Sequence, residues 1–60
     1  MNREEFTQLY EVDDKIRKPD WNEHEYLQIK YIGKKFIFAE DEKGNEMDWE
    51  IDEDWERFDA

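Results

Sequence analysis

The sequence predicts an α+β fold: a short N-terminal helix followed by a small antiparallel β-meander, forming a single small acidic domain over residues 1–60. Apolar residues recur at helical spacing only near the N-terminus, whereas from residue 26 onward they alternate with polar ones, as in half-buried strands. No linker or internal repeat interrupts the chain, and its 60 residues suffice for one domain. Three Trp, three Tyr and four Phe supply apolar area for a core despite the 47% of charged residues.

The first expected element is a helix over roughly residues 3–12. Asn2 is followed three positions later by Glu5, the arrangement of a capping box, in which each side chain bonds the backbone N–H of the other residue. The apolar side chains expected to face the core recur at i, i+3 and i+4: Phe6, Leu9 and Tyr10. Because so short a helix is unstable alone, it must pack against the rest of the chain.

Two strands and a loop are expected next. Residues 15–18 predict a short strand closed by Pro19, and residues 20–25 predict a loop that carries Trp21. Over residues 26–32 apolar and polar side chains alternate, which predicts a half-buried strand. The side chains expected on its buried side are Leu27, Ile29 and Tyr31.

The rest of the sequence predicts two further strands and a C-terminal segment whose secondary structure has two alternatives. Residues 35–39 continue the sheet with Phe36 and Phe38 facing together, and residues 41–45 predict a turn. In the following strand the side chains expected to point inward are Met47, Trp49 and Ile51. Those expected on its acidic outer face are Glu46, Asp48 and Glu50. Residues 52–58 fit either a helical turn or a last strand.

Charge is distributed unevenly along the chain. The net charge is −10, of which residues 1–39 carry −1 and residues 40–60 carry −9, whereas residues 15–35 are locally basic by +3. This balance disfavours direct nucleic-acid binding, which needs a basic footprint. The acidic end fits a solvated face, docking to a basic partner, or pairing with the basic middle of a second copy in a homo-oligomer.

Composition also excludes several classes of protein. The chain has no Cys and no Ser, one Thr and one His, so the usual nucleophile and base pairs cannot form, and we expect no enzyme and no catalytic residue. We expect no metal and no cofactor, since Asp41–Asn45 lacks the ligand spacing of a calcium loop. The longest apolar run, Phe36–Ala39, is far shorter than the roughly 20 residues of a membrane span, and no signal peptide is evident. A cytoplasmic location is expected, in the host cell if a phage encodes the protein.

Three tryptophans are candidates for contact with a ligand or partner. Trp21 lies near Arg17 and Lys18, where it fits either stacking on a base with cations nearby for phosphate, or a place in the core. Trp49 and Trp55 lie in the acidic end, where they fit either anchors of a protein interface or, again, core residues.

The segment Lys-Ile-Arg-Lys-Pro-Asp-Trp at residues 15–21 stands between the expected helix and a strand that begins Tyr26-Leu27, and the chain closes with Glu-Asp-Trp-Glu at residues 53–56. In this order the motifs resemble a family of small phage proteins, the Thoeris anti-defence nucleotide sponges and their relatives, over roughly residues 6–58. The resemblance implies a compact α+β oligomer that sequesters a cyclic nucleotide signal of host immunity without destroying it. The positions that match are Arg17, Lys18, Trp21, Asp54 and Trp55.

We therefore expect a phage-type counter-defence protein that blunts host antiviral immunity by binding, not by catalysis. In one form it sequesters a nucleotide signal, and the candidate ligand-binding residues are Arg17, Lys18, Trp21 and Lys30. In the alternative it is an acidic, DNA-mimic-like decoy that inhibits a nucleic-acid-binding host defence protein. The candidate partner-binding residues are then Trp49, Glu50, Asp52, Glu53, Asp54 and Trp55. A small accessory interaction module is the third possibility.

Overall fold

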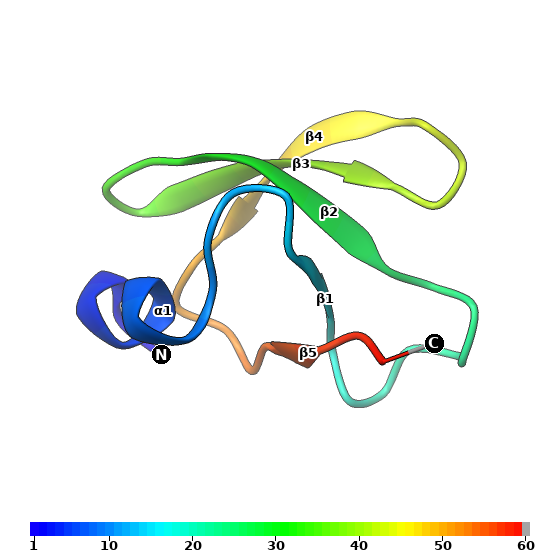
Figure 1. Ribbon diagram of the computed structural model, residues 1–60, viewed down its shortest axis with the longest axis horizontal. Helices are drawn as coiled ribbons and strands as arrows, with labels where there is room; N and C mark the ends of the chain where they lie inside the picture. The colour runs from blue at the N-terminus through cyan, green and yellow to red at the C-terminus, as the bar shows by residue number, and fades with distance from the viewer. Residues whose placement is uncertain (60) are drawn as a thin grey trace.

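One short helix and a five-stranded antiparallel sheet make up the computed structural model, which describes residues 1–59 (Figure 1). The elements are α1 (Arg3–Leu9), β1 (Lys15–Arg17), β2 (Leu27–Ile32), β3 (Phe36–Asp41), β4 (Glu46–Glu50) and β5 (Glu56–Arg57). Along the sheet the strands follow the order β4-β3-β2-β1-β5. The expected α+β class is confirmed.

Helix α1 begins as predicted and ends earlier. Its capping box is present: the Glu5 N–H donates to Asn2 Oδ1 at 2.9 Å, and the Asn2 N–H donates to Glu5 Oε1 at 3.4 Å. Continuation to residue 12 is wrong, because Tyr10 already has extended backbone angles, φ −136° and ψ 152°. Asp13 then takes a positive φ of 81°, and the chain turns toward β1. Leu9, expected in the core, is exposed, since the short helix buries Phe6 and its cap residue Tyr10.

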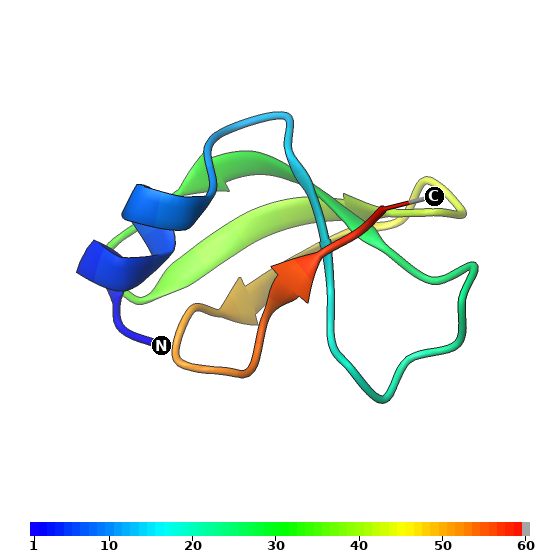
Figure 2. The same ribbon diagram turned by 60° about the horizontal axis from the view of Figure 1, so that its bottom comes forward.

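The end of the chain returns to β1, which settles the structure of residues 52–58 in favour of a strand. Ile16 in β1 lies opposite Arg57 in β5, and the Phe58 N–H donates to the Lys15 carbonyl at 3.0 Å. The sheet is therefore more than a meander, because β1 lies between β2 and β5 (Figure 2). The loop between β1 and β2 extends away from α1 in the same view.

A β-bulge at Lys30 changes which side chains of β2 are buried. Ile29 lies opposite Ala39, but Tyr31 lies opposite Phe38, so Lys30 is an extra residue in β2. Because a bulge reverses the alternation beyond it, Leu27 and Ile29 are buried as expected whereas Tyr31 is 66% exposed. The prediction that Tyr31 faces the core is wrong.

The core lies between two layers, with β2, β3 and β4 on one side and α1 and β5 on the other (Figure 1). Its buried side chains are Phe6, Tyr10, Ile16, Leu27, Ile29, Ile37, Ala39, Ile51 and Trp55. Phe36 and Phe38 face together as predicted, on the outer side of β3, since Ile37 and Ala39 occupy the inner side. Met47, expected to point inward, stays exposed because it lies on the edge strand beside the projecting β3–β4 turn.

The predicted turn at residues 41–45 is confirmed. Asp41 Oδ1 accepts hydrogen bonds from the Lys43 N–H at 2.8 Å and the Asn45 N–H at 2.9 Å. Gly44 has φ +86°, a conformation that side-chain-bearing residues rarely adopt. The hydrogen bonds from Asn45 and Lys43 hold the pKa of Asp41 below its usual value, with the Asn45 backbone N–H the largest cause. The turn thereby fixes the register of β3 and β4.

Candidate functional site

Three tryptophans from distant parts of the chain meet beside the end of β4. Trp21 comes from the β1–β2 loop, Trp49 from β4, and Trp55 from the segment before β5. Their ring centroids lie 5.4 Å apart for Trp21 and Trp49, 6.0 Å for Trp21 and Trp55, and 5.9 Å for Trp49 and Trp55, all edge to face. Such pairs add stability beyond their buried area, so the tryptophan cluster joins the β1–β2 loop, β4 and the segment before β5.

Hydrogen bonding differs between two of these indoles. Trp55 is 5% exposed, and its Nε1–H donates to the Glu50 carbonyl at 3.0 Å, which ties the end of β4 to the segment before β5. Trp49 is half-buried, and its buried Nε1 has no hydrogen-bond partner among residues 1–59. The structure thus places Trp55 in the core and Trp49 against it, leaving Trp49 the more accessible of the two to a partner.

Arg17, Lys18 and Trp21, three of the candidate ligand-binding residues, lie together as expected. The Lys18 ammonium lies 5.5 Å from the Trp49 ring and 5.4 Å from the Trp55 ring, and 3.1 Å from Glu53 Oε1. Arg17 Nε lies 3.4 Å from Glu56 Oε2, and the guanidinium also donates to the Trp21 carbonyl. Lys30, the fourth candidate, is on β2 and pairs with Glu40 at 3.6 Å. Each candidate cation already has a carboxylate partner.

The basic middle of the chain therefore pairs with its own acidic end. Two other ion pairs link the beginning of the chain to its end: the N-terminal amine lies 3.4 Å from Asp52, and Arg57 lies 3.7 Å from Asp14. Sequence analysis gave the charges of the two segments but not this pairing. A phosphate entering beside Arg17 and Lys18 would have to compete with two carboxylates for the same cations.

The candidate partner-binding residues divide between core and surface. Glu50, Asp52 and Asp54 face solvent, and the side chain of Asp52 is 91% exposed. Glu53 is partly buried and holds Lys18. In residues 49–55, a partner can therefore reach the carboxylates more readily than the indole rings.

Strand β4 carries a row of carboxylates that sequence analysis assigned to an outer face but, Glu50 apart, not to the candidate site. Glu46, Asp48 and Glu50 are all exposed, and none has a cation within 4.0 Å in the described part of the chain. The strict alternation of acidic residues at i, i+2 and i+4 was the available signal. Because β4 is an edge strand, this acidic row lies at the border of the sheet.

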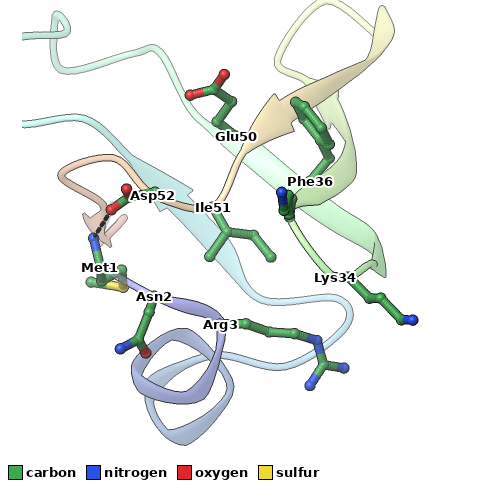
Figure 3. Close-up of a pocket in the computed structure, with 9 residues that line it drawn as sticks. Met1, Asn2, Arg3, Lys34, Phe36, Glu50, Ile51 and Asp52 are labelled. Carbon is green, nitrogen blue, oxygen red and sulfur yellow. Dashed lines mark hydrogen bonds and ion pairs between the residues drawn. The ribbon is translucent and has the colours of Figure 1, made fainter.

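Two open hollows of about 430 Å³ each lie beside the β2–β3 turn. The first is bordered by the start of the chain, the turn and the end of β4, and Figure 3 shows Asp52 bound to the N-terminal amine at its edge. Its Arg3 is also engaged, since Nε donates to the Gly33 carbonyl at 2.9 Å. The second is bordered mainly by Tyr31, Phe36 and Phe38 on the outer face of the sheet.

Residues 1–59 contain no group of three or more His, Cys, Asp or Glu side chains placed to hold a metal ion. Among the same residues there is no helix long and apolar enough to cross a membrane. Burial raises the pKa of Tyr10, whose hydroxyl donates to the Trp55 carbonyl at 3.4 Å, although the Arg57 charge opposes that shift. Tyr10 is therefore a buried residue of the core.

Comparison of the chain with protein-family models, with curated proteins and with solved structures finds no match. The resemblance to the Thoeris anti-defence sponges stays a prediction.

Proposed function

We propose that this protein acts by binding: its acidic row, Glu46, Asp48 and Glu50 on β4, docks on a basic surface of a partner protein. The observation that carries the proposal is that these three exposed carboxylates have no cationic partner among residues 1–59. Alternate residues of a strand lie about 6.6–6.8 Å apart on one face. The strand therefore presents regularly spaced negative charges, as a nucleic-acid backbone does.

The charge of the whole molecule supports the same proposal. Internal ion pairs engage four of the cations, Arg17, Lys18, Lys30 and Arg57. The net charge of the chain is −10. A field of this sign steers a basic surface toward the protein and repels nucleic acid. In the counter-defence setting that we propose, the partner is a nucleic-acid-binding host protein, and occupation of its basic groove inhibits it.

Nucleotide sequestration has weaker support from the geometry. Its candidate cations Arg17 and Lys18 are held by Glu56 and Glu53, and the Lys18 ammonium already occupies the space over two tryptophan rings. A nucleotide would have to displace these carboxylates before its phosphate met a cation. In the accessory-module interpretation, by contrast, the acidic face is only solvated and the protein has no inhibitory role.

The proposal is tested by capture from a defence-proficient host lysate with three forms of the protein. The first is wild type, the second neutralises the acidic row (E46Q/D48N/E50Q), and the third is a control with the same charge change elsewhere (E4Q/E11Q/D20N). We expect wild type and control to retain a basic protein that is released when salt rises from about 50 to about 200 mM, and the acidic-row variant to lose it.

Two results would count against the proposal. Equal capture by all three forms would show that the acidic row is not the docking surface. A nucleotide released from the protein by heating, with no partner protein, would support sequestration in its place. Mass spectrometry of both the protein and the small-molecule fraction separates these outcomes.

A further inference from the structure

The outer face of β2 and β3 carries three exposed aromatic rings next to the acidic row. Tyr31 is 66% exposed, Phe36 is 49% exposed and Phe38 is 36% exposed. The bulge at Lys30 is what turns Tyr31 to this side. Together they border a hollow of about 430 Å³. Contiguous exposed apolar surface of this kind marks an interaction site more often than a solitary exposed side chain does.

Sheet register pairs these rings with the carboxylates of β4. Phe38 lies directly opposite Asp48, and Phe36 lies directly opposite Glu50. Directly opposite residues share one face of the sheet, with Cβ atoms about 4.5–5.5 Å apart. The face thus repeats one unit, an aromatic ring beside a carboxylate, twice at a spacing of about 6.6–6.8 Å along the strands. Tyr31 lies opposite Phe38 and adds a second ring to the unit formed by Phe38 and Asp48.

An aromatic ring beside a carboxylate binds the guanidinium group of arginine better than the ammonium group of lysine. Arginine stacks its plane on an aromatic face while its N–H groups donate in parallel to a carboxylate. Lysine offers a point charge that does not stack and holds its hydration more strongly. Two such units at a two-residue strand spacing match arginines at positions i and i+2 of an extended segment.

We propose, resting on the proposed function, that this aromatic–acidic face binds an extended, arginine-bearing segment of the partner protein. One arginine lies over Phe38 and pairs with Asp48, and the arginine two residues away lies over Phe36 and pairs with Glu50. The rings then form the apolar centre of the interface and the carboxylates fix its register.

Charge argues against other occupants of this face. A second copy of the chain offers arginines only at positions 3, 17 and 57, never two residues apart, and Arg17 and Arg57 are already ion-paired. Single-stranded nucleic acid would stack on the rings, and Lys34 and Lys35 border the same hollow. However, Asp48 and Glu50 stand directly beside the rings, where they repel phosphate.

The test uses the full chain and a synthetic extended peptide, Thr-Arg-Thr-Arg-Thr, followed by backbone amide NMR shifts. Its lysine counterpart and a short oligo-dT serve as comparison probes. We expect shifts confined to β2, β3 and β4, and weaker binding of the lysine peptide. The variant F36T/F38T keeps strand-forming residues on an exposed face and should lower the affinity for the arginine peptide by about tenfold. The matched control L9Q/V12T removes two exposed apolar side chains elsewhere and should leave binding unchanged.

The outcomes separate this inference from the proposed function. If D48N/E50Q abolishes peptide binding but F36T/F38T does not, acidic docking stands and the aromatic–acidic face is refuted. If neither variant changes binding, both proposals fail. Preferential binding of oligo-dT, or a dimer in sedimentation that F36T/F38T abolishes, would also overturn the arginine assignment. Circular dichroism of each variant verifies that the fold is retained.

Discussion

Two tryptophans in one cluster should lose different amounts of stability on the same substitution. Trp55→Phe removes an indole N–H that donates to the Glu50 carbonyl at 3.0 Å, whereas Trp49→Phe removes a buried N–H without a partner among residues 1–59. Both variants exchange an indole for a smaller ring within the same edge-to-face contacts, at a shared packing loss of about 1 kcal/mol.

Hydrogen bonding decides the difference between them. Trp55→Phe also forfeits a bond worth about 1 kcal/mol, so its free energy of unfolding should fall by about 2 kcal/mol. Trp49→Phe removes an unsatisfied buried donor that costs about 1–3 kcal/mol, which offsets the packing loss. Its stability should stay within about 1 kcal/mol of wild type. A difference of about 2 kcal/mol corresponds to roughly 8–16 °C in Tm for a domain of this size.

Urea unfolding followed by far-ultraviolet circular dichroism measures this difference without relying on tryptophan fluorescence. Equal urea dependence of the free energy in the three proteins would show that the variants change stability and not compactness. Equal destabilisation by the two substitutions, or a greater loss with Trp49→Phe, would refute the hydrogen-bond assignment. It would also count against the hydrogen bond that ties the segment before β5 to the end of β4.

Three further predictions concern the β3–β4 turn and the internal ion pairs. Gly44→Ala should lower the free energy of unfolding by about 1 kcal/mol because Gly44 has φ +86°, as thermal denaturation will measure. Because the pKa of Asp41 is lowered by folding, its stabilising contribution is present above its unfolded pKa near 3.8 and is lost as pH falls through the lower folded value. Urea midpoints of wild type and Asp41→Asn should therefore converge at acid pH; a constant gap down to strong acid would contradict this. Lys18→Met should lower the free energy of unfolding by about 1 kcal/mol, and by less in high salt, because it removes the ion pair with Glu53 and the contacts with two indoles. A loss of stability that does not depend on salt would point to packing alone.

Local signals in the sequence sufficed for the fold class and for much of the fold. The capping box of Asn2 and Glu5 and the turn from Asp41 to Gly44 depend on residues close in the chain, and both were predicted correctly. Tyr31 was misplaced because the bulge at Lys30 is a property of how β2 pairs with β3. No pattern within β2 reveals an extra residue.

Long-range pairing limited what could be predicted of the site. Proximity of Arg17, Lys18 and Trp21 followed from their short separation in sequence. Their neutralisation by Glu53 and Glu56 depends on β5 returning to β1, which no local pattern indicates. Similarly, alternation predicted an acidic face on β4 and a shared side for Phe36 and Phe38. Only the register between β3 and β4 shows that rings and carboxylates stand side by side.

Displacement of duplex DNA from the captured partner tests the role of the acidic row most directly. With the partner purified, fluorescence anisotropy of labelled DNA reports how much wild type, E46Q/D48N/E50Q and the control E4Q/E11Q/D20N displace. We predict that wild type and control release DNA and weaken as salt rises, and that the acidic-row variant needs about tenfold higher concentration or more. Equal potency of the three proteins, or DNA that stays bound while the protein binds beside it, would contradict docking of β4 in a basic groove.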